Sequence, residues 1–266
     1  MAKFVSSVGV LPQHAFGICL SIFLIIVSIV IALSTIITII GWTGSSIFGK
    51  IKKMPSERKD AIEVEGRRTP WKRRFSLNSF HGSVTHGNLV RLLILFHLPI
   101  TIYSCYHLTL SPSVASVQGK VLAGLSFTLF SLLLPAWLIF RIATTSTPKL
   151  YEATRTLLAL GPLYNQYQPK SQLFCVLFFA SNVVTGTVVG FGQQSGTVQA
   201  VIILIVEVLI TLSTSVWLPW MTGAQMGVIS FMFCVARIIA TVLVVILAPP
   251  VCPLPDLHPS LTFVTG

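Results

Sequence analysis

One carboxylate in this sequence lies where an ion is costly to keep. Residues 201–210 read VIILIVEVLI, and Glu207 is the only polar side chain in that stretch. A charge at the centre of a bilayer costs about 2.5–3.5 kcal/mol on insertion scales, so it needs a partner or a use. Arg237 lies in the next apolar run, and two antiparallel helices would place the residues roughly 12 and 16 Å from the same membrane boundary. We therefore predict an intramembrane charge pair between Glu207 and Arg237.

Polar and small residues follow this pair at helical spacing in three consecutive apolar runs, which would give each helix a polar stripe. The stripes are Asn182 and Thr185; Thr211, Thr214 and Ser215; and Ser230, Cys234 and Thr241. Gly186 and Gly190 form a GxxxG pattern, which predicts close helix packing. Two hypotheses remain open. Either the stripes line a path in which Glu207 binds a cation or proton, or the pair is a structural clamp, which the presence of one acid and one base favours.

The remaining reactive residue types do not form a catalytic or metal site. His97 and His107 are ten residues apart, about 15 Å along a helix, so we interpret them as core histidines. Four of the five cysteines lie inside apolar runs. No hydrolase or nucleotide-binding motif is present, and a single carboxylate in the apolar runs excludes an intramembrane two-aspartate protease. We expect a protein that is not an enzyme and that binds neither a metal nor a cofactor.

The composition places these residues in a membrane. The 266-residue chain is 53 % hydrophobic and 9 % charged, with a mean hydropathy of +0.84. Lipid cannot satisfy free backbone groups, so apolar runs of about 20 residues predict spanning helices. The fold expected is an all-α, polytopic transmembrane helix bundle with about six spans and one short interfacial helix. The spans are 16–41, 89–110, 121–142, 171–191, 199–218 and 227–248, within a membrane domain 16–249 between an N-terminal segment 1–15 and an irregular tail 250–266.

Lysine and arginine predict the orientation, because they are enriched in cytosolic loops. The 42–88 loop holds ten of them, the 143–170 loop holds Lys149, Arg155 and Lys170, and the other side holds Lys3 and Lys120. We expect both loops to be cytosolic, and the N-terminal segment and the tail to be luminal or exterior. The net charge of +11 is concentrated in one loop, which argues against nucleic acid as a partner.

The two cytosolic loops have different patterns. The 42–88 loop is basic and is expected to be flexible; it either contacts anionic lipid headgroups or is merely solvated. Its RRFS sequence makes Ser76 a candidate phosphorylation site. In the second loop, leucines recur on one face of residues 150–161, which predicts a short helix lying in the membrane interface. Gly161 and Pro162 are expected to end that helix.

Long blocks of the sequence resemble the membrane domain of the fungal TRP-like family, the polycystin-like channels also called flavin carriers. The blocks are RLLILFHLPITIYSCYHLTL (91–110), LPAWLIFRI (134–142), TPKLYEATRTLLALGPLYNQYQPKSQLFC (147–175), FASNVVTG (179–186) and SVWLPWMTGAQMGVISFMFCVARII (215–239). The resemblance implies a protein of the endoplasmic reticulum or plasma membrane that transports a cation such as Ca²⁺, or FAD, and that is a candidate homo-oligomer. FAD would be a transported solute and not a bound cofactor.

The sequence also departs from that family. Members usually begin with a signal peptide and a luminal lipid-recognition-like domain, and they continue past the ARII helix into a further span. We expect neither feature in this chain, and the three prolines that follow Pro250 oppose a helix. We therefore expect a truncated chain. The alternative functions are a non-transporting membrane scaffold and an inactive fragment of such a protein.

Overall fold

The computed structural model describes residues 9–51, 70–217, 219 and 224–246. These residues are almost entirely helical and contain no β-strand. The helices are η1 (Pro12–His14), α2 (Ala15–Ile51), α3 (Pro70–Thr109), α4 (Val117–Ser126), the π-helical segment η2 (Phe127–Leu133), α5 (Leu134–Thr144), α6 (Thr147–Glu152), α7 (Thr154–Tyr164), η3 (Gln172–Phe174), α8 (Cys175–Phe191), α9 (Gly196–Trp217) and α10 (Ala224–Ile246).

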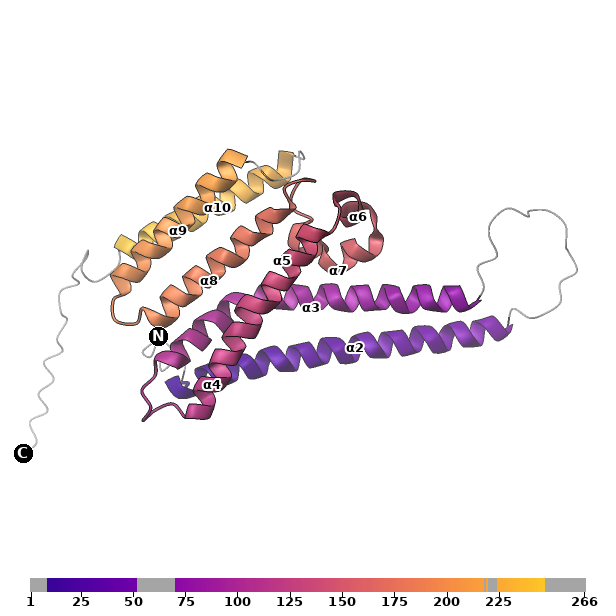
Figure 1. The fold of residues 1–266 in the computed structure, drawn as a ribbon, viewed down its shortest axis with the longest axis horizontal. Coiled ribbons are helices and arrows are strands. Elements are labelled where there is room, and N and C mark those ends of the chain that lie inside the picture. The colour runs from indigo at the N-terminus through magenta and orange to yellow at the C-terminus, as the bar shows by residue number, and fades with distance from the viewer. Residues whose placement is uncertain (1–8, 52–69, 218, 220–223, 247–266) are drawn as a thin grey trace, which may run out of the picture.

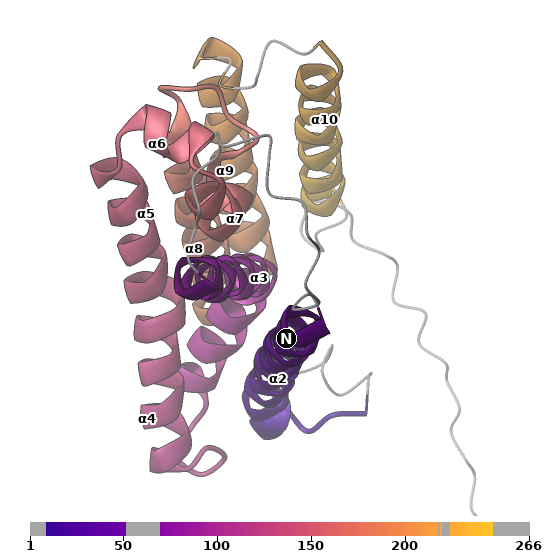
Figure 2. The ribbon, with the colours of Figure 1, turned by 90° about the vertical axis from the view of Figure 1, so that its right-hand side faces the viewer.

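Helix α3 is the centre of the arrangement. It packs against α2, α4, η2, α7 and α8, and the helices α8, α9 and α10 then follow one another outward (Figure 1). One apolar cluster joins α3 to α5, α6, α7 and α8 through residues such as Leu93, Ile142 and Tyr164. A second cluster joins α2, α3 and α4 through Phe23, Ile100 and Ala123. In the view of Figure 2, α10 lies at the edge of the bundle, beside α9.

The lengths of the helices fit a membrane bundle. By length and composition, five spans are long and apolar enough to cross a membrane within the described part of the chain. They are Pro12–Ile40, Gly82–Thr109, Val117–Thr144, Gln172–Phe191 and Gly196–Trp217. The sixth predicted span corresponds to α10, in which Phe231–Ile246 forms a shorter apolar helix. The protein is thus an all-helical membrane bundle.

The prediction of a flexible loop over 42–88 was wrong at both ends. Helix α2 continues to Ile51, and α3 begins at Pro70, well before its apolar part. Once a helix is nucleated, each added residue gains one hydrogen bond, so an extension without an interior proline continues the helix. Proline suits the first position of α3, where its missing N–H is not needed. Residues 52–69, the middle of the predicted loop, lie outside the described residues.

The prediction of one interfacial helix over 150–161 was also wrong in its bounds. The chain forms two helices that are separated at Ala153, which has an extended conformation (φ −78°, ψ 106°). Helix α7 continues through Gly161 and Pro162 to Tyr164 and buries Leu160, Leu163 and Tyr164. Packing of this buried face against α3 outweighs the one backbone hydrogen bond that Pro162 removes. Helix α7 is therefore part of the core.

The ends of the predicted domain organisation are described only in part. Within the predicted N-terminal segment 1–15, the residues Pro12–His14 and Ala15 are already helical. The tail 250–266 lies outside the described residues, as do residues 1–8.

Candidate functional site

Glu207 and Arg237 lie on neighbouring helices and contact each other. An Arg237 Nη2 atom donates a hydrogen bond of 2.6 Å to Glu207 Oε1. The two sides of this ion pair differ in their surroundings, since the side chain of Glu207 is 8 % exposed and that of Arg237 is 54 % exposed. The carboxylate of Glu207 is thus buried where α9 meets α10, and the guanidinium of Arg237 forms the exposed side of the ion pair.

The depth of the pair explains why each residue needs the other. Arg237 lies thirteen residues after Ala224 and nine before Ile246, about 20 and 14 Å along the helix. The side chain of a helical residue leans toward the N-terminal end of its helix, which for Arg237 is the more distant end. The guanidinium therefore does not easily reach the headgroups, and Glu207 is its ion-pair partner within the described residues.

Two of the hydroxyl groups in the predicted stripes, those of Thr214 and Thr241, are bonded to their own helices. Thr214 Oγ1 donates to the Ile210 and Thr211 carbonyls, at 2.9 and 3.0 Å, and Thr241 Oγ1 donates to the Arg237 carbonyl at 2.7 Å. Such bonds satisfy a hydroxyl without any partner across the interface. Asn182, Thr185 and Thr211 are half-buried and Ser215 is exposed. The side chain of Ser230 lies outside the described residues.

The two glycines of the GxxxG pattern lie at a close approach between α8 and α3. A Cβ atom at Gly186 would lie 2.6 Å from Thr101 Cγ2, and one at Gly190 would lie 2.8 Å from the Ile102 carbonyl oxygen. Both glycines are buried. The missing side chains therefore let α8 contact the backbone of α3.

A stripe of three polar side chains on α3, which the sequence did not reveal as a stripe, is buried beside this contact. His97, Thr101 and Ser104 lie on one face of α3, at positions i, i+4 and i+7, and have no exposed surface. Thr101 Oγ1 donates to the His97 carbonyl at 2.7 Å and to Ser131 Oγ at 2.8 Å. The spacing HLPITIYS was the signal that could have identified this fourth polar stripe.

The His97 ring contacts a backbone carbonyl of the π-helical segment η2 close to Pro135. Pro135 has no N–H to donate to the Ser131 carbonyl four residues earlier, and His97 Nε2 lies 3.2 Å from that oxygen. Since a carbonyl only accepts, His97 Nε2 carries the proton. Within the described residues, His97 Nδ1, Ser104 Oγ and both ring nitrogens of His107 have no hydrogen-bond partner. Both histidines are buried, as expected of core residues. The interpretation that their hydrogen bonds are satisfied holds in part for His97 and is wrong for His107.

No cluster of three metal-ligating side chains occurs in the part of the chain that the structure describes. Ser76 falls within α3, where a kinase would meet a helix and not an extended peptide. Its side chain lies outside the described residues.

Comparison with known families gives one result. The family model described as transient receptor potential (TRP) ion channel matches residues 1–252. Comparisons with curated proteins and with solved structures gave no match.

Proposed function

Because the chain belongs to the transient receptor potential (TRP) ion channel family, we propose that it is the membrane domain of a transport protein. The solute is a cation such as Ca²⁺, or FAD, and the membrane is the endoplasmic reticulum or the plasma membrane. The observation that carries the proposal is a charge pair inside the apolar helices, half-exposed on its arginine side. A polar surface of this kind at membrane depth is typical of proteins that surround a path for solutes or ions.

The roles of the two residues in this proposal are unequal. Glu207 is enclosed and bonded to Arg237, so it is not free to take up a cation. We assign the pair the role of a clamp that holds α10 against α9. Breaking a buried pair by removing one partner costs about 3–5 kcal/mol, because it leaves an unpaired charge, and the loss of both charges costs much less.

The guanidinium also bears on the solute. A solute passing this point meets the half-exposed positive charge of Arg237 before it meets the enclosed carboxylate. If the path ran along this side of α10, the guanidinium would attract an anion such as FAD and repel Ca²⁺, and the solute preference would then depend on Arg237. If Ca²⁺ is the solute, we expect its path to avoid the outer side of α10.

The experiment is flux into vesicles that contain the purified chain, measured for Ca²⁺ and for FAD. It compares the wild type with Glu207→Gln and with the double variant Glu207→Gln/Arg237→Gln. We expect the wild type to transport one of the solutes, Glu207→Gln to reduce the amount of folded protein, and the double variant to restore it with near-normal flux per molecule.

Two outcomes would contradict this proposal at different points. Wild-type vesicles that pass neither solute faster than protein-free vesicles would contradict transport, and they would favour the scaffold or fragment. If the double variant folds normally but changes which solute passes, the pair belongs to the path and is not only a clamp.

A further inference from the structure

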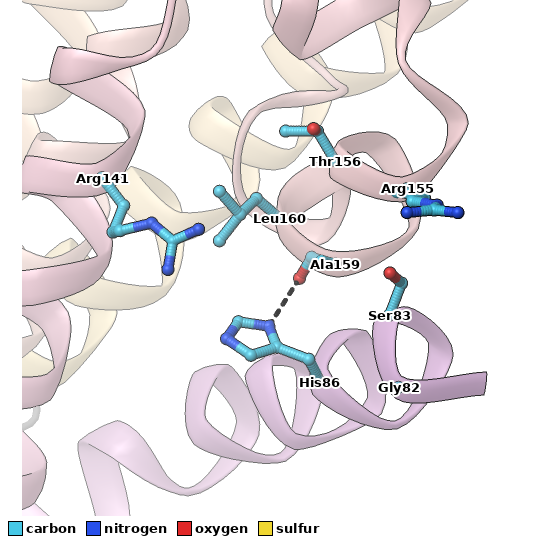
Figure 3. Close-up of a pocket in the computed structure, with 8 residues that line it drawn as sticks. All are labelled: Gly82, Ser83, His86, Arg141, Arg155, Thr156, Ala159 and Leu160. Carbon is cyan, nitrogen blue, oxygen red and sulfur yellow. Dashed lines mark hydrogen bonds between the residues drawn. The ribbon is translucent and has the colours of Figure 1, made fainter. Parts of the chain in front are cut away.

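A cavity of 310 Å³ lies between α3, α5 and α7, away from the charge pair (Figure 3). Its lining residues are Gly82, Ser83, His86, Arg141, Arg155, Thr156, Ala159 and Leu160. The set contains two arginines, one histidine and two hydroxyl side chains, and no carboxylate. Small-molecule sites span about 300–1,000 Å³, so this cavity suits a small polar group.

The two arginines come from different helices, and neither forms an ion pair with a residue in the described part of the chain. Arg141 belongs to α5 and Arg155 to α7, and Figure 3 shows them on either side of the contact between His86 and Ala159. The ion pair found among the described residues joins Glu207 to Arg237 and involves neither of them. Glu152, three residues before Arg155, lies beyond the break at Ala153 and makes no ion pair with it. Among the described residues, the cavity therefore has two arginines and no carboxylate that pairs with them.

The floor of the cavity is held in place by α3. His86 Nδ1 lies 3.2 Å from the Ala159 carbonyl and donates to it, because a carbonyl only accepts. The next residue, Gly87, has the Leu158 carbonyl so close to its Cα that no side chain fits. These contacts fix the distance between α3 and α7, so the cavity is a feature of the packing and not of loose loops.

The depth of the cavity points to the level of the lipid headgroups. Arg141 lies three residues before the end of a candidate span at Thr144, about 5 Å along a helix. The Arg141 Cζ atom lies 5.2 Å from the centre of the Trp137 ring. Tryptophan is enriched at membrane interfaces, and its ring face attracts a guanidinium.

We propose that this cavity binds the phosphate group of an anionic lipid. Guanidinium groups present paired N–H donors that match phosphate oxygens, and the Thr156 hydroxyl can add a third donor. The same chemistry would suit a soluble phosphate compound. The position of Arg141 beside the span end at Thr144 favours a lipid, whose phosphate is already at that depth. The proposal is independent of whether the protein transports a solute.

The experiment measures lipid retention by native mass spectrometry of the full chain in detergent, with phosphatidic acid and phosphatidylcholine offered in equal amounts. The variants are Arg141→Gln, Arg155→Gln and their combination. Lys149→Gln is the matched control, since it removes one positive charge from the same connection without lining the cavity. We expect preferential retention of phosphatidic acid by the wild type and the control, and about tenfold weaker retention in each arginine variant, the usual effect of losing one charge-assisted contact.

Several outcomes would overturn the proposal. Equal retention of both lipids by the wild type, or an equal loss in Lys149→Gln, would show attraction to the general positive charge and no site. Displacement of phosphatidic acid by inorganic phosphate, together with binding of phosphate alone, would reassign the cavity to a soluble ligand. Arg141→Gln also removes the packing of Arg141 on Trp137, whereas Arg155→Gln tests the loss of charge without that change. Thermal unfolding of each variant checks that it is folded.

Discussion

Tyr164 is the single residue that ties the two short helices of the α5–α8 connection together. It has no exposed surface, and its hydroxyl donates to the Leu150 carbonyl at the end of α6. Its ring also meets the ring of Tyr151 edge to face, with centroids 5.2 Å apart. In turn, the Tyr151 hydroxyl donates to the Tyr167 carbonyl at 3.0 Å. These contacts fix the bend at Ala153, and no periodicity in the sequence could have indicated them.

The buried state of this tyrosine predicts a pH dependence. Burial, and secondarily the neighbouring Tyr151, raises the pKa of Tyr164 from its ordinary value of 10.0 to about 12. Because the pKa is higher in the folded state, the neutral phenol stabilises the fold below pH 10.0, and this contribution is lost as the pH rises toward 12. We expect a difference titration at the phenolate absorbance, wild type minus Tyr164→Phe, to show an ionisation near pH 12.

The reference for this titration is the same pair of proteins unfolded in detergent, where the step should return to about pH 10. A folded protein whose difference titration also shows the step at that ordinary value would contradict the burial of Tyr164.

At the scale of helices, two prolines have the same consequence. Pro135 has no N–H to donate to the Ser131 carbonyl four residues earlier, and His97 of α3 lies 3.2 Å from that oxygen. Pro162 likewise leaves the Leu158 carbonyl free, and this carbonyl lies against Gly87 of α3. In both cases a gap in the hydrogen bonding of one helix becomes a contact with the central helix. The expectation that Pro162 ends a helix was wrong, because packing of α7 against α3 outweighs the backbone hydrogen bond that this proline removes.

The contact at Gly87 predicts a specific sensitivity. A Cβ atom at this position would overlap the backbone carbonyl of Leu158, which cannot move aside as a side chain would. We expect Gly87→Ala to separate α3 from α7 and to destabilise the protein by about 1–3 kcal/mol, as overpacking usually does. Thermal unfolding in detergent measures this effect.

Gly124→Ala is the control for that variant. Gly124 also lies in a helix, α4, but a Cβ atom there meets nothing within 4 Å. Alanine is a better helix former than glycine by about 1 kcal/mol, so this change should be neutral or stabilising. An equal loss of stability in both variants would mean that the effect of Gly87→Ala does not come from the contact with α7.

The sequence predicted the helices well and the tertiary contacts unevenly. Long apolar runs indicated every span, and the isolated charges Glu207 and Arg237 indicated which two helices are neighbours. The polar extension of α3 before residue 89 was missed, because a span is recognised by its apolar part alone. The stripe of His97, Thr101 and Ser104 was missed because each residue, taken singly, is compatible with an ordinary core. The phosphate site that we propose combines residues from three helices, which no local pattern brings together.

For the whole molecule, several contacts place the connections between helices at two opposite ends. The Gln168 backbone N–H donates to the Pro219 carbonyl at 2.8 Å, and the ring centroids of Phe174 and Trp217 are 6.2 Å apart. The α5–α8 connection and the end of α9 therefore lie at one end of the bundle. In Figure 1 the connection between α8 and α9 lies at the opposite end. This alternation is the arrangement that an antiparallel membrane bundle requires.

The positions of the lysines and arginines predict which end of the bundle faces the cytosol. The α5–α8 connection holds Lys149, Arg155 and Lys170, whereas Lys120 follows the α3–α4 turn at the other end. Since positive loops remain in the cytosol, we expect Lys149→Cys to react with a membrane-impermeant maleimide in sealed vesicles that expose their cytosolic face. Lys120→Cys should react only after detergent opens the vesicles.

The unsubstituted chain is the control for this experiment, because Cys19, Cys105, Cys175 and Cys234 are free thiols within the described helices. Its labelling sets the background that each added cysteine must exceed. The reverse labelling pattern would show that the protein has the opposite orientation in the membrane. The proposed lipid site would then lie in the opposite leaflet but would not be excluded. Equal labelling of both positions in sealed vesicles would contradict the bundle itself, since the span Val117–Thr144 separates the two residues by one membrane crossing.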